Sequence, residues 1–309
     1  KKTAYQDCYA SLNAGKTLGI GNYDSANIIH SNGKFYLLVG TSTSNRDHFY
    51  IVDAKTLYYE NSAVVGANLS GLTILNEQYG LVTGDGIRRI DLKSLNNVRI
   101  KNERLLCFYN SIIYNGKVLS NDTYKDESKV KYYDVNELIA AKEGEAPAVT
   151  ELDIIQKQKI NFVLAKDGNV YTLESADNGC NIVKIKNDFT LEKVFANFQP
   201  AKGPYHSSPT IGMVASETEN IIYLVSTDGA IYKYILGDSD SLKAPFIAAE
   251  SGVSITAPLQ LNQQSGELYV TYTEERKDES KIVVYSKDGK VLHTVDCGES
   301  VPSQILFNN

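Results

Sequence analysis

The chain has 309 residues, of which 42% are hydrophobic and 22% charged, the composition of a globular protein with room for two ordinary domains or one large all-β domain. Its net charge is −6 and its lysines and arginines are scattered, which excludes a nucleic-acid-binding surface, since that needs a concentrated basic face. No apolar run reaches the roughly 18 residues that a membrane-spanning helix requires.

The N-terminal residues, KKTAYQDCYA, are basic at the tip but lack the apolar segment of a signal peptide. Two alternatives remain: the protein is cytosolic, or an export signal precedes Lys1. The cysteines form no CxxC motif and have no zinc-site spacing. One or two disulfides in an exported protein and four buried thiols are equally compatible with their positions, which are Cys8, Cys107, Cys180 and Cys297.

A long-period repeat is the main feature between about residues 28 and 300. Each copy has a turn with Gly, Asn or Asp, a strand of β-branched and aromatic residues, a polar loop and a second strand. The spacing averages about 47 residues, which fits four short strands with their turns, the size of one β-propeller blade. The first strands of the copies lie near Tyr36, Val82, Val118, Tyr171, Tyr223 and Tyr269.

A recurring Asp, Lys or Asn turn follows the second strand of most copies and is expected to start the outermost strand of each blade. Its versions are VDAKTL, IDLKSL, YDVNEL, IKNDFTL and YSKDGKV. Helical composition is confined to residues 135–145, VNELIAAKEGE, where we expect at most a short turn of helix in a loop.

The two ends of the chain are expected to complete the ring. Residues 5–21 are interpreted as one or two outer strands and residues 301–309, VPSQILFNN, as an innermost strand. Residues 1–27 and 301–309 would then jointly close a seventh blade, which would remove open sheet edges. We therefore predict an all-β, seven-bladed β-propeller that forms a single domain over residues 1–309, with six or eight blades as the alternatives.

The C-terminal run, GELYVTYTEERKDESKIVVYSKDGKVLHTVDCGESVPSQILFNN, resembles the last blade of YncE-like, or YVTN, β-propellers. In particular, it is similar to exported Bacteroidota lipoproteins related to cobalamin-capturing surface propellers. The resemblance implies a lipid-anchored protein at the outer membrane surface or in the periplasm. It also implies a non-enzymatic role in nutrient capture, in which a corrinoid or a similar ligand passes to a TonB-dependent transporter.

The segment GPYHSSP, residues 203–209, concentrates a tyrosine, a histidine and two serines. Neighbouring side chains of an extended segment point in opposite directions, so His206 and Ser207 are poorly placed as base and nucleophile, and no GxSxG motif occurs. The predicted inner strands carry almost no acidic residues, which argues against a carboxylate-bound metal in the channel. We therefore expect no catalytic residue, no resident metal and no cofactor; a metal-dependent lactonase-type hydrolase is one alternative.

The propeller model places the loops between second and third strands, and the connectors between blades, around one mouth of the channel. These segments offer aromatic faces with amide and guanidinium donors, which suit a large polar ligand such as a corrinoid, a siderophore or a glycan. A scaffold for protein partners is the other alternative. The predicted ligand-binding residues are Tyr23, Arg46, His48, Asn68, Tyr124, Tyr205, His206, Tyr272 and Arg276.

Overall fold

The computed structural model describes most of the chain and divides it into two compact units. Unit 1 comprises residues 1–125 and 130–151, and unit 2 comprises residues 126–129 and 152–307. The expectation of a single domain stays a prediction. The described residues are 11–15, 23–41, 46–66, 69–84, 86–101, 111–121, 128–145, 147–156, 161–201, 212–274, 279–298 and 307.

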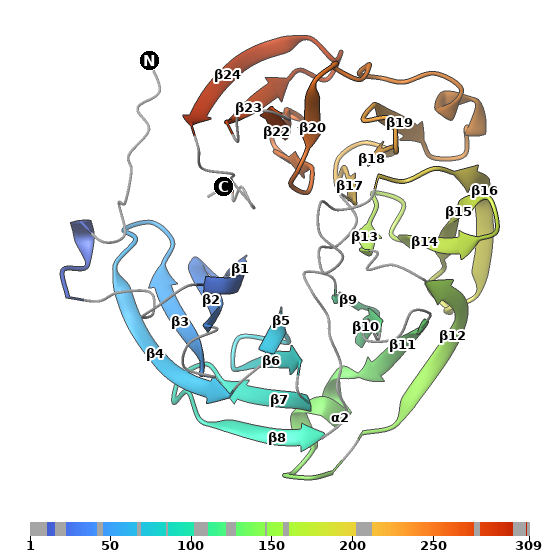
Figure 1. Cartoon of the computed structure of the whole chain (residues 1–309). Helices are drawn as coiled ribbons and strands as arrows, with labels where there is room; N and C mark the ends of the chain where they lie inside the picture. Colours follow the sequence, from blue (N-terminus) through green and yellow to red (C-terminus); the bar gives the residue numbers. More distant parts are fainter. Residues whose placement is uncertain are drawn as a thin grey trace. The chain divides into compact units, whose positions relative to one another are not determined.

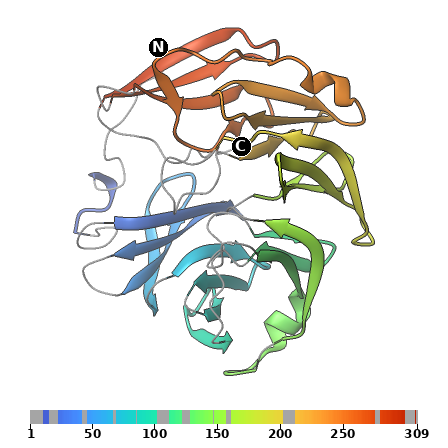
Figure 2. The ribbon, with the colours of Figure 1, turned by 45° about the vertical axis from the view of Figure 1, so that its right-hand side comes forward.

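Unit 1 contains two complete antiparallel sheets, each with its strands in sequence order. Figures 1 and 2 both show the four strands of sheet 1 side by side, in blue. Sheet 1 consists of β1 (Tyr23–Ser31), β2 (Lys34–Thr41), β3 (Asp47–Asp53) and β4 (Tyr59–Gly66). Sheet 2 consists of β5 (Leu69–Ile74), β6 (Tyr79–Gly84), β7 (Gly86–Asp91) and β8 (Asn97–Lys101).

Sheet 3 follows the same order, and the boundary between the units runs through its two outer strands. A six-residue helix, α2 (Val135–Ala140), precedes its last strand, and Asp134 caps it by accepting hydrogen bonds from two backbone N–H groups. This confirms the short helix expected within residues 135–145. The strands of sheet 3 are β9 (Ile112–Tyr114), β10 (Lys117–Asn121), β11 (Ser128–Asp134) and β12 (Val149–Gln156).

Unit 2 contains three more antiparallel sheets. Sheet 4 consists of β13 (Val163–Leu164), β14 (Val170–Ala176), β15 (Gly179–Ile185) and β16 (Leu191–Phe198). Sheet 5 has three strands, β17 (Met213–Ala215), β18 (Ile221–Val225) and β19 (Ile231–Ile235), followed by the 3₁₀-helix η1 (Ser239–Leu242). In sheet 6, two short strands share the innermost position, and its strands are β20 (Val253–Ile255), β21 (Gln260–Leu261), β22 (Leu268–Glu274), β23 (Ser280–Tyr285) and β24 (Val291–Gly298).

The core of each unit lies between consecutive sheets. In unit 1, Phe49 of sheet 1 packs with Val82 of sheet 2, and Leu81 of sheet 2 packs with Val118 of sheet 3. The alternation along β6 explains this, because successive side chains point to opposite faces of a strand. Unit 2 has equivalent clusters between sheets 4 and 5 and between sheets 5 and 6. Consecutive four-stranded sheets stacked face to face are the blades of a β-propeller.

The turn between the third and fourth strands is nearly identical in sheets 1 and 2. Asp53 Oδ1 accepts hydrogen bonds from the backbone N–H groups of Lys55 and Thr56. Asp91 Oδ1 accepts the equivalent bonds from the backbone N–H groups of Lys93 and Ser94. A leucine with positive φ closes each turn, Leu57 at 60° and Leu95 at 59°. These contacts confirm that the VDAKTL and IDLKSL motifs lead into the outermost strand.

The prediction of seven blades is wrong, because the described residues form six sheets. The strands predicted as the first of each repeat copy are present, and each is the second strand of its sheet. The innermost strand of sheet 1 is β1. Residues 11–15, expected within an outer strand, instead form a short helical segment followed by a bend and a turn. Asn13 ties this turn to sheet 1: its Nδ2 donates to Leu57 O at 2.8 Å, and its Oδ1 accepts from Tyr59 N at 2.6 Å.

The closing strand predicted at the C-terminus lies almost wholly outside the described residues. Phe307 is described, and the centroid of its ring lies 5.0 Å from that of Tyr269, a residue of β22 in sheet 6.

Candidate ligand-binding site

Buried polar side chains gather at one end of the sheets, the end at which the second strand passes to the third; below it is called the polar end. The fourth strand also finishes there. Asp47 and Ser280 begin third strands, and their exposed fractions are only 3% each. The other buried polar residues at this end are Thr83, Lys101, Ser120, Asn121, Gln156, Asn181 and Ser226. Burial of such groups needs specific partners, so this end is the chemically demanding one.

At the opposite end, sheets 2, 4, 5 and 6 have short turns whose polar groups bond within the turn. Asn76, Asp167, Ser216 and Asn262 each accept hydrogen bonds from backbone N–H groups two or three residues further on. Side chains of this kind stabilise turns by replacing a backbone acceptor. Their hydrogen-bonding capacity serves the fold.

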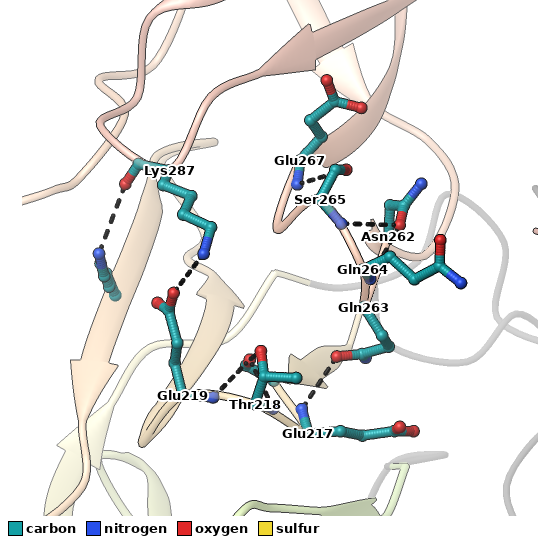
Figure 3. A network of polar contacts seen from close by, with 11 residues as sticks. Glu217, Thr218, Glu219, Asn262, Gln263, Gln264, Ser265, Glu267 and Lys287 are labelled. Carbon is teal, nitrogen blue, oxygen red and sulfur yellow. Dashed lines mark hydrogen bonds and ion pairs between the residues drawn. The ribbon is translucent and has the colours of Figure 1, made fainter. Parts of the chain in front are cut away.

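A polar network joins two such turns in unit 2 (Figure 3). Gln263 bridges from sheet 6 to sheet 5: its Oε1 accepts from Glu217 N at 2.9 Å, and its Nε2 donates to Ala215 O at 3.0 Å. Lys287 Nζ lies 2.5 Å from Glu219 Oε1, and this bond holds the pKa of the Glu219 carboxyl below its ordinary value. The network fastens sheet 5 to sheet 6 at the end opposite the polar end.

At the polar end of sheet 1, three polar residues lie at the entry to β3, with Arg46 directly before the strand and Asp47 and His48 as its first two residues. Arg46 is exposed, Asp47 is buried and His48 is half-buried. The His48 ring stacks on Tyr50, with ring centroids 5.9 Å apart and planes 20° from parallel. An exposed guanidinium next to a half-buried imidazole and an aromatic face is a combination that a polar, partly planar ligand can use.

The polar end of the gap between sheets 2 and 3 contains a buried cation. Lys101 is 7% exposed, and its Nζ lies 5.6 Å from the centre of the Tyr133 ring. Thr83 and Ser120, 2% and 1% exposed, lie at the ends of the neighbouring second strands. Thr83 Oγ1 has no hydrogen-bond partner in the described structure.

The polar end of sheet 4 is organised differently, as a chain of hydrogen bonds. Gln156 Nε2 donates to Thr172 Oγ1 and to Leu173 O, both at 3.0 Å. Thr172 Oγ1 donates in turn to Asn161 O at 3.0 Å. The Asn161 side chain then donates to Met213 O at 2.7 Å and accepts from Met213 N at 3.0 Å. Each member has a partner, so this network has a structural role.

The described structure places four of the nine predicted ligand-binding residues. Tyr23 begins β1 opposite Thr41, and Arg46 and His48 lie together at the start of β3. Tyr272 is 3% exposed inside the core of unit 2, where its hydroxyl lies 3.0 Å from the Tyr285 hydroxyl. This differs from the expected surface position, because Tyr272 precedes the loop within β22. The other five, Asn68, Tyr124, Tyr205, His206 and Arg276, lie outside the described residues.

Sequence analysis missed Thr83, Lys101 and Gln156, because loop composition guided the choice and these residues lie inside strands. A usable signal was present for Lys101, since a lysine that ends the NVRIK strand follows an isoleucine buried in the core. Within the described ranges, no three histidine, cysteine or acidic side chains lie close enough together to hold a metal ion. No helix among those residues is long and apolar enough to span a membrane.

Comparison with solved structures finds the same fold at low sequence identity. The β-propeller domain of Cps50 (Swd1) from Myceliophteria thermophila is 12% identical with a TM-score of 0.55, and the match covers 93% of this chain and 91% of that one. A streptogramin B lyase is 14% identical with a TM-score of 0.52, over 89% of this chain and 84% of that one. A prolyl endopeptidase is 12% identical with a TM-score of 0.56, over 91% of this chain.

The match covers only 44% of the prolyl endopeptidase chain, and at such identities the likeness shows the fold alone. No curated protein matches the sequence. A family model does match, over residues 1–308. The chain therefore belongs to the family described as a domain of unknown function, DUF5074.

Proposed function

We propose that this propeller binds a small polar molecule at the polar end of sheets 1 and 2 and does so without catalysing a reaction. The observation that carries the proposal is the set of buried polar and charged side chains at this end of unit 1, among them Asp47, Thr83 and Lys101. Stability alone does not require polar groups at these positions, because apolar residues would fill them at a lower desolvation cost. A ligand that makes directional contacts at this end gives the polar residues a role.

Ligand screening tests the proposal. Thermal-shift and calorimetric measurements against corrinoids, siderophores and oligosaccharides should give one class that raises the unfolding temperature and binds saturably. His48→Ala and Arg46→Ala should each weaken that binding at least roughly fivefold, about 1 kcal/mol. The control is His293→Ala, an exposed histidine on β24. Equal loss in the control, or turnover of ester or lactone substrates that a chelator abolishes, would contradict a non-enzymatic binding role at this end.

The resemblance of the C-terminal run supplies a biological setting for this proposal. In that setting the protein is exported, is held by a lipid anchor at the outer membrane or in the periplasm, and delivers its ligand to a TonB-dependent transporter. Cell fractionation of the natural protein tests the location. Recovery of a transporter after in vivo crosslinking tests the partner, and a cytosolic location would overturn both.

A second candidate, a scaffold for protein partners, is favoured by one observation. The outermost strand of sheet 6, β24, is exposed along almost its whole length and carries apolar side chains, with Val291 at 59%, Leu292 at 43% and Val295 at 42%. Exposed apolar edge strands are sites of pairing with other chains. Retention of a protein partner that Val291→Lys abolishes, with no hit in the ligand screen, would favour the scaffold.

A further inference from the structure

We draw no further inference here: the strongest candidate, the exposed apolar surface of β24 at the outer edge of sheet 6, carries none, because nothing in the part of the chain that the structure describes shows what covers it.

Discussion

Two buried threonines show how differently the polar ends of sheets 2 and 4 are built. Thr172 of sheet 4 is 0% exposed, accepts a bond from Gln156 and donates one to Asn161. Thr83 of sheet 2 is buried to nearly the same degree but makes no hydrogen bond in the described structure. A threonine thus completes a hydrogen-bond network in sheet 4, whereas in sheet 2 the threonine hydroxyl has no hydrogen-bond partner in the described structure. Burial alone therefore does not distinguish a structural polar group from a candidate binding group; the partners do.

Substitution of Gly86 should have the largest effect, because it disturbs the turn between β6 and β7 at the polar end of sheet 2. Its φ is 101°, and an added Cβ would lie 2.5 Å from Lys101 O. Gly86→Ala should lower the free energy of unfolding by about 3 kcal/mol, since backbone strain and steric overlap add. Gly33→Ala is the control, with a φ of 69° and open space, and should cost about 1 kcal/mol. Urea denaturation measures both, and equal losses would contradict close packing at Gly86.

Gln156 should come next, because its loss breaks the completed network. Gln156→Leu removes two donors and leaves the carbonyl of Leu173 without this bond, which should cost about 2 kcal/mol. Gln264→Leu, at an exposed position in a turn of unit 2, should change the free energy of unfolding by less than about 0.5 kcal/mol. A loss at Gln156 no larger than in this control would mean that the sheet 4 network contributes little.

The two threonines themselves give the most direct test of the comparison. Thr172→Val should lower the free energy of unfolding by about 1 kcal/mol, because it removes a donor and an acceptor that are in use. Thr83→Val should raise it by about 1 kcal/mol, because it removes a buried hydroxyl that makes no hydrogen bond in the described structure. Chemical denaturation of the two variants in parallel measures the difference. A loss of stability in both would show that Thr83 has a structural partner.

Acid should weaken sheet 4 through Asp167. Burial raises the pKa of this carboxyl, but bonds from Lys184 at 2.9 Å and the Tyr171 hydroxyl at 2.8 Å outweigh it, so the pKa lies below the ordinary value. The folded state therefore gains stability from Asp167 above about pH 4 and loses it as the pH falls through the lowered pKa. Asp167→Asn should flatten the fall in stability below pH 4, measured by denaturation at several pH values. Asp153→Asn, at an exposed carboxylate, should leave the slope unchanged.

The smallest effect concerns Cys180, near the polar end of sheet 4. Burial raises the pKa of its thiol to about 11, so at pH 8 it stays protonated and shielded. Iodoacetamide followed by peptide mass spectrometry should show slower modification of Cys180 than of the half-exposed Cys297. Equal rates would mean that the polar end of sheet 4 opens readily.

The sequence predicted the repeat well, because its signal is local. The six second strands and the Asp turns follow from the alternation and the turn chemistry of short segments. The predicted number of blades was wrong. Residues 11–15 have a composition that is compatible with a strand, and nothing in the local sequence reveals that Asn13 bonds to a distant turn. Arg46 and His48 were predicted as ligand-binding residues because they lie in or next to a loop, and this stays a prediction. Thr83 was missed, because only the register of three strands places it in one row with Ile87 and Lys101.

The tie between Asn13 and sheet 1 has a consequence for measurements on the first residues of the chain. One side-chain amide supplies both the donor for Leu57 O and the acceptor for Tyr59 N, so it takes the place of a neighbouring strand at the start of β4. The amide proton of Tyr59 should then exchange with deuterated solvent only when residues 11–15 detach. Its exchange rate reports the free energy of that detachment, and Asn13→Ala should bring the rate close to that of an open turn.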